Sequence, residues 1–219
     1  PLDGAAAGAP SHSIHLKPLA EDALSLPVRT GKARVIGIEP ASLVTKSLVR
    51  EVKTDDAGCF QSALNPGLTK IAVIERHKRT GKLGIGILEG YGLTGGAIAT
   101  TISHDSHNIV VAGDNDPDML LAVRELADMG GGIVSVHGGS IRRLPLPIAG
   151  LMTSADPQEV NAVLHDMLVA ARAELGIPED VEPFMTLSFM ALPVIPELKL
   201  TARGLFNVNT FSFVGVEAD

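Results

Sequence analysis

Apolar residues in this chain come in short runs, each ended by a turn or a polar break. Ala33–Ile38 and Leu48–Val52 are rich in β-branched residues, and neither is long enough to form a helix. Thr69–His77 and Lys82–Leu88 flank a tight turn at Arg79–Gly81, as a strand and its return strand do. This pattern limits most of the chain to β-sheet and predicts a fold built on strands.

Two helices interrupt the strands. Asp116 precedes Pro117 as an N-cap, and Gly130 is suited to end that helix. The second helix begins at Asp156 and stops before Gly176, while the apolar run Leu187–Leu192 is bounded by prolines and stays unassigned. Further strands are expected at Ala97–Thr101, Ile109–Ala112, Ile133–Val136, the segment after Gly139, and Phe211–Val216. We therefore expect an α+β fold with mixed β-sheets and at least two helices.

Composition narrows the partners and the compartment. The 219 residues have a net charge of −7, which gives no electrostatic reason to bind nucleic acid or anionic lipid. Aromatic residues make up only 3%, too few for base-stacking platforms. The single cysteine, Cys59, cannot form an internal disulfide, and no apolar run approaches the ~20 residues of a membrane span. We expect a cytoplasmic protein without nucleic-acid or membrane partners.

The first ten residues are mostly small. Pro1–Pro10 has the composition of a linker rather than of a domain edge, and the sequence does not begin with methionine. The chain is therefore expected to be a piece of a longer protein or a processed product.

The densest polar cluster lies between two predicted strands, where functional sites are often found. It holds Ser103, His104, Asp105, His107 and Asn108. The two histidines could converge on a metal or bind a polar ligand. The alternative is a hydrogen-bonded turn in which the aspartate and the asparagine satisfy backbone amides.

A second charged cluster follows the strand before the turn at Arg79–Gly81. Glu75 and His77 would share one face of that strand while Arg76 points away from them. A solvated strand end or an intersubunit salt bridge is the favoured interpretation, with a functional site as the alternative. The glycines of Gly84–Gly96 lack a phosphate-binding pattern and are expected to serve turns and close strand approach.

Several long segments, read in order, resemble the C-terminal domain of bacterial adenine deaminases, which belong to the amidohydrolase superfamily. The resemblance covers roughly Ile14 to Phe213. Its most specific parts are SHDSHN and PFMTLSFMALPVIPELKL. The segments that carry it are Val73–Gly86, Gly90–Asn108, Met129–Gly132, Leu144–Met152 and Pro183–Leu200.

This resemblance implies an enzyme that hydrolyses adenine to hypoxanthine and ammonia. In that family a binuclear manganese or iron centre activates the attacking water, and its ligands lie on a preceding (β/α)₈ barrel. The chain has no His-x-His motif and no room for eight βα units. We therefore expect no catalytic residue, metal ligand or cofactor of its own, and no activity in the isolated chain. The barrel, adenine and further copies of the protein are the expected partners.

The resemblance also suggests how the chain is divided. Residues 1–13 would be a linker, residues 14–66 a β-rich part of the small amidohydrolase sandwich, and residues 67–219 an appended α/β domain. The Ser103–Asn108 loop would face the barrel mouth or a subunit interface and help to close or order the active site. Two other functions remain open: a non-catalytic oligomerisation or interaction domain, and an independent enzyme whose two histidines bind a metal.

Overall fold

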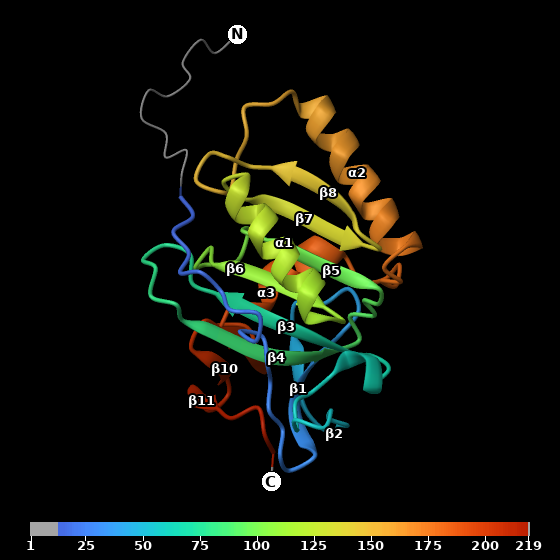
Figure 1. Cartoon of the computed structure of the whole chain (residues 1–219), viewed down its shortest axis with the longest axis vertical. Coiled ribbons are helices and arrows are strands. Elements are labelled where there is room, and N and C mark those ends of the chain that lie inside the picture. The colour runs from blue at the N-terminus through green and yellow to red at the C-terminus, as the bar shows by residue number, and fades with distance from the viewer. Residues whose placement is uncertain (1–12, 219) are drawn as a thin grey trace.

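The computed structural model describes residues 13–218, whose strands form two sheets (Figure 1). The main sheet has the order β2-β1-β4-β3-β6-β5-β7-β8, and the small sheet has the order β11-β10-β9. The strands are β1 Lys32–Ile38, β2 Thr45–Glu51, β3 Leu68–Ile74, β4 Leu83–Glu89, β5 Gly96–Thr100, β6 Ile109–Gly113, β7 Gly132–His137, β8 Ser140–Pro145, β9 Leu198–Thr201, β10 Gly204–Asn207 and β11 Ser212–Val214. Apart from Ser13, the predicted linker lies outside the described residues.

The short apolar runs predict strands correctly. Every strand expected from the sequence is present, with ends within three residues of those expected. In the main sheet, neighbouring strands are antiparallel except for β1 and β4, which run parallel with Ile36 opposite Leu88. The expectation of an α+β fold with mixed sheets is confirmed.

Helices cover both faces of the main sheet, and α1 crosses in front of it in Figure 1. Alternate residues of β3 enter the two resulting cores. Ile71 and Val73 pack in the cluster that includes α2 and α3, whereas Ala72 and Ile74 pack in the cluster that includes α1. The helices are η1 Ser62–Leu64 (a short 3₁₀ turn), α1 Asp116–Asp128, α2 Pro157–Ala173 and α3 Pro183–Met190.

Two predicted helices are present, one with a shifted cap. Asn115, not Asp116, is the N-cap of α1, because its side chain accepts a hydrogen bond from the Asp118 amide at 2.9 Å. The Asp116 carboxylate instead lies 2.6 Å from the buried Lys70 ammonium. Asp156 caps α2 as predicted.

Helix α3 is the element that the sequence did not reveal. Its residues are apolar all round and mostly buried, so the sequence carries no amphipathic period there. The usable signal was Glu182 followed by Pro183, the acidic-residue-then-proline start that Asp156–Pro157 also shows. Within residues 13–218, none of the helices is long and apolar enough to cross a membrane.

The small sheet packs against the main sheet at a point where only glycine fits. A Cβ placed on Gly84 of β4 would lie 2.0 Å from the Thr201 carbonyl oxygen of β9. This close strand approach is the role predicted for glycines in this region.

Strand β1 has two kinds of neighbour on one edge. Its parallel ladder with β4 is restricted to Ile36 and Gly37. Nearer its start, the Arg34 amide donates to the Val216 carbonyl at 2.6 Å, and the Ala218 amide donates to the Lys32 carbonyl at 3.0 Å. Strands β1 and β2 thus belong to the same sheet as β3–β8. The boundary at residue 66 and the sandwich assignment of residues 14–66 stay predictions.

Candidate functional site

The two polar clusters singled out in the sequence lie side by side. The loop Ser103–Asn108, here called the histidine loop, joins β5 to β6. Ile74, the last residue of β3, pairs with Ile109, the first of β6, so the residues after β3 run beside this loop. His77 Nε2 lies 2.8 Å from the Ser106 carbonyl oxygen. The fold therefore joins the clusters into one site.

Arg76 is the centre of this site. It is 1% exposed, and its guanidinium donates to the carbonyls of His107, Ala149 (2.9 Å) and Ser13 (3.2 Å) and to the Ser13 hydroxyl (2.8 Å). No carboxylate of residues 13–218 pairs with it. Burial lowers the pKa of Arg76 from its ordinary value. A solvated strand end is therefore the wrong interpretation for this residue, because it holds three chain segments together from inside.

The Glu75 carboxylate stabilises the turn that directly follows it. Its carboxylate accepts hydrogen bonds from the amides of His77 (2.6 Å), Lys78 (2.7 Å) and Thr80 (3.0 Å) and from the Thr80 hydroxyl (2.8 Å). Burial by itself would raise the pKa of Glu75, but these bonds outweigh it and lower the pKa to about 2. Glu75 is thus fully engaged in shaping the turn that presents His77.

His104 fixes the start of the histidine loop against α3. Its ring packs on Phe189 with centroids 4.4 Å apart, and its amide donates to the Ser188 carbonyl at 3.1 Å. The ring of His107 lies 6.3 Å from that of His104. Both imidazoles are therefore held in place, one by stacking and the other by the backbone of its turn.

His107 is set up as a neutral imidazole. Burial lowers its pKa, and the electrostatic effects of Arg76, His104 and His77 act in the same direction against the opposing effect of Asp105. Its backbone has φ of +47°, a strained value for a residue with a side chain, and its carbonyl is held by Arg76. The site thus presents an uncharged ring that can accept or donate a hydrogen bond.

Two buried polar atoms of the loop have no partner within residues 13–218: Ser103 Oγ and His107 Nδ1. The turn interpretation accounts for only part of the loop. The His107 amide bonds to the Ser103 carbonyl at 2.6 Å, and Asn108 Oδ1 accepts the Arg76 amide at 3.4 Å. Asp105 is exposed. The loop is therefore a rigid turn that keeps unused hydrogen-bonding capacity.

The side chains of the histidine loop and its neighbours do not form a metal site. In the described part of the chain, no three His, Cys, Asp or Glu side chains gather as metal ligands would. His104 and His107 lack a third protein ligand, so the residues present do not fit the binuclear centre that the family resemblance implies.

Sequence reasoning missed the segments that complete the site. Thr101 Oγ1 donates to the Gly150 carbonyl at 2.5 Å and accepts the Gly132 amide at 2.8 Å. Ala149 has φ of +58°, and a Cβ on Gly150 would lie 2.8 Å from Arg76 Nη1. Apart from the resemblance of Leu144–Met152 to the family, no local pattern places these residues beside the histidine loop.

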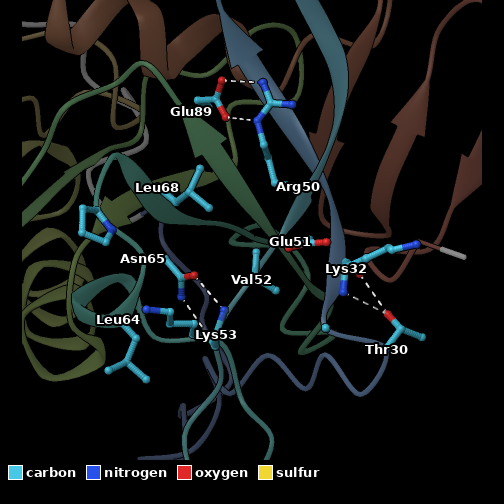
Figure 2. A pocket seen from close by; sticks show the side chains of 12 residues that line it. Thr30, Lys32, Arg50, Glu51, Val52, Lys53, Leu64, Asn65, Leu68 and Glu89 are labelled. Carbon is cyan, nitrogen blue, oxygen red and sulfur yellow. Dashed lines mark hydrogen bonds and ion pairs between the residues drawn. The ribbon is translucent and has the colours of Figure 1, made fainter.

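A larger cleft lies away from this site. Its volume is about 650 Å³, and it opens at the other end of β3, around Leu68 (Figure 2). Figure 2 shows that Arg50 holds Glu89 through two bonds of 2.6 and 2.8 Å and that Asn65 bonds to the backbone of Lys53. Arg50, Glu89 and Asn65 are therefore engaged within the chain itself.

Known proteins share this sequence over most of its length. Residues 42–212 match the family described as the adenine deaminase C-terminal domain. The chain is 58% identical over 205 residues to an adenine deaminase of Nitratidesulfovibrio vulgaris Hildenborough, covering 93% of this chain and 35% of that protein. An adenine deaminase of Clostridium acetobutylicum is 44% identical over 205 residues, covering 93% and 36%.

A Bacillus licheniformis adenine deaminase is 44% identical over 216 residues, covering 98% of this chain and 37% of that protein. The chain thus spans about a third of the length of these relatives. The match includes the histidine loop, Arg76 and α3, so the site described above lies inside the shared region. The chain belongs to the adenine deaminase C-terminal domain family.

Proposed function

We propose that this chain is the C-terminal portion of an enzyme that hydrolyses adenine, with water as co-substrate, to hypoxanthine and ammonia. The match over 93% of the chain to a protein named adenine deaminase carries the proposal. The relatives are almost three times as long, which leaves ample room for a separate catalytic domain before the matched region.

The chemistry itself belongs to that preceding domain. A manganese or iron centre on a barrel would supply the activated water, and the ligands would not come from this chain, whose described residues gather no suitable donor set. This chain would instead contribute the wall of the active site. Such a wall excludes bulk water and orients a substrate without touching the reacting bond.

The histidine loop suits that role. Arg76 and Phe189 fix its two ends, so a substrate would meet side chains that are already in position. A purine carries ring nitrogens and an exocyclic amine along its edges. The half-buried His107 ring can hydrogen-bond such an edge, whereas the unpartnered Ser103 hydroxyl is enclosed by the chain.

Replacing His107 in the full-length enzyme tests the proposal. In His107→Ala we expect kcat/KM for adenine to fall roughly 10- to 100-fold, the value of one or two hydrogen bonds to substrate, with metal content unchanged. His165→Ala, at an exposed position on α2, is the matched control and should leave kcat/KM unchanged. An unchanged kcat/KM in His107→Ala, with unchanged metal content, would refute an active-site role for the loop.

The second candidate function is an oligomerisation or interaction domain without a part in catalysis. Exposed apolar side chains on α2, Val163 and Val169, favour it. In that case charged substitutions at these two valines would alter subunit assembly in sedimentation experiments, and His107→Ala would leave kcat/KM unchanged. The homo-oligomeric state and the cytoplasmic location remain part of the proposal. The inactivity of the isolated chain is also part of the proposal, and an adenine deamination assay of this chain tests it directly.

A further inference from the structure

A groove of about 490 Å³ runs between α2 and α3 with the main sheet as its floor. His104, the first imidazole of the histidine loop, forms part of its wall. Most of the other side chains that line it are apolar: Ile102, Ile133, Leu164, Phe184, Met185 and Phe189. The groove therefore adjoins the candidate site and has a different, apolar character.

Met185 stands at the mouth of this groove. It is 56% exposed, whereas the preceding Phe184 is 7% exposed. A methionine side chain gains about 1.5–3 kcal/mol when fully buried, and soluble proteins rarely leave a contiguous apolar surface of this kind facing water. The surface thus has the character of an interface.

The polar atoms of the groove are largely committed to the chain itself. The Ser188 hydroxyl donates to the Met185 carbonyl at 2.9 Å, and the Glu182 carboxylate accepts the Met185 amide. Thr100 Oγ1 accepts the Ile102 amide at 3.0 Å. A small polar ligand would find few groups to orient it, so the groove favours apolar side chains as its occupants.

The neighbouring contacts indicate where those side chains come from. The matched family is described as a C-terminal domain, and the chain spans about a third of the length of its relatives, so the relatives hold a large further part that a C-terminal domain follows. The described chain begins at Ser13, which Arg76 holds beside the His107 carbonyl. The histidine loop then leads from His107 to His104 in the groove wall. The described residues therefore start beside the same loop that walls the groove, so a domain joined through the residues before Ser13 is within reach of the groove.

We infer that the groove between α2 and α3 is the seat for apolar side chains of the preceding domain of the same polypeptide. The inference rests on the proposed function, because it takes the full-length arrangement from the adenine deaminases. It adds a surface and an occupant that the proposed function does not specify. Docking there would press on the His104–Phe189 stack and so link domain contact to the position of the histidine loop.

Methionine oxidation in the full-length enzyme tests the seat without an activity measurement. Hydrogen peroxide converts exposed methionine to the sulfoxide at a rate that follows exposure, and peptide mass spectrometry reports each site. Met185 should react at least about tenfold more slowly in the folded enzyme than in the enzyme unfolded in guanidinium. Met152, 58% exposed in this chain, shows whether peroxide reaches a comparable methionine.

Three results would overturn the inference. They are oxidation of Met185 at the unfolded rate, protection that vanishes when the enzyme is diluted to monomer, and protection that arises only after adenine is added. The first leaves the groove open, the second assigns it to another copy, and the third assigns it to a small ligand. All three are independent of the deaminase assay, so failure here is distinct from failure of the proposed function.

A pair of substitutions gives a second readout. Met185→Gln keeps the length of the side chain and a good helix former, so on a solvent-exposed surface it should leave the melting temperature unchanged. In a filled seat it places an amide among apolar groups, and the full-length enzyme should melt roughly 4 °C or more lower. Met152→Gln, the same substitution at a 58% exposed position outside the groove, is the matched control with no expected shift. Equal melting temperatures for Met185→Gln and the wild type would contradict the inference.

Discussion

Replacing Arg76 with methionine should destabilise this chain far more than replacing an exposed arginine. The substitution removes the guanidinium that bonds the carbonyls of His107, Ala149 and Ser13. Each buried carbonyl left without a partner costs about 1–3 kcal/mol. In the wild type, burying the unpaired positive charge of Arg76 is unfavourable, and the same burial lowers the pKa of Arg76. The variant has no such charge to bury, which offsets part of the loss. We expect a net loss of about 3 kcal/mol in the free energy of unfolding.

Equilibrium urea denaturation of the 219-residue chain measures this loss. Arg143→Met is the control, because Arg143 forms a partly exposed pair with Glu125 (2.6 Å), and such pairs contribute about 1 kcal/mol or less. A loss in Arg76→Met no larger than that in Arg143→Met would refute the view that Arg76 holds the three segments together.

Arg76→Lys separates geometry from charge. Lysine keeps the positive charge but has a single ammonium, which cannot reach carbonyls that lie on different sides of a planar guanidinium. The variant should therefore lose nearly as much stability as Arg76→Met. Full stability in Arg76→Lys would mean that charge, rather than the fork of donors, is what the site needs.

Two further predictions concern the same region. Gly150→Ala should lower the free energy of unfolding by about 1–2 kcal/mol, because Gly150 has φ of +71° and the new Cβ would lie 2.8 Å from Arg76 Nη1. In urea denaturation, the double variant with Arg76→Met should lose less than the sum of the two single losses. Strictly additive losses would contradict the contact between these residues. Glu75 has a folded pKa of about 2 against an ordinary value of 4.5, so its contribution to stability is complete above about pH 4.5 and is lost as the pH falls towards 2. Unfolding measured from pH 7 to pH 3 should show the stability difference between wild type and Glu75→Gln shrinking below pH 4.5, and a constant difference would argue against this role.

The strands were predictable because their cause is local. Runs such as Ile109–Ala112 are apolar on both faces and too short for a helix, and the structure buries them on both faces between helices. Helix α3 was not predictable in that way, since its sequence is apolar around the helix and has no polar face that would reveal a helical period. The exact cap of α1 was not predictable either, because Asn115 and Asp116 are both good caps and the pairing of Asp116 with the distant Lys70 is not visible in the local sequence.

The candidate site, too, was predictable only in part from the sequence. Its histidines were visible as a polar cluster between two apolar strands, and family resemblance marked the loop as specific. The role of Arg76 was not visible, because an arginine after a strand is usually solvated and nothing local indicates burial. Its partners, Ser13 and Ala149, lie 63 and 73 positions away, and only the folded chain brings them together.

The pairing of β1 has a consequence for the order in which the molecule forms. Arg34 bonds to the carbonyls of Gly215 and Glu217, the latter 183 positions further on. The hairpin of β1 and β2 can form early from local contacts, and β4 can then pair with Ile36 and Gly37. The part of the β1 edge near Arg34 stays open until almost the whole described chain has been synthesised. Such non-local closure carries a large entropic cost and slows folding. A nascent chain of this domain therefore exposes an unfinished sheet edge until the ribosome has nearly completed it, the period in which strand edges are most prone to aggregate.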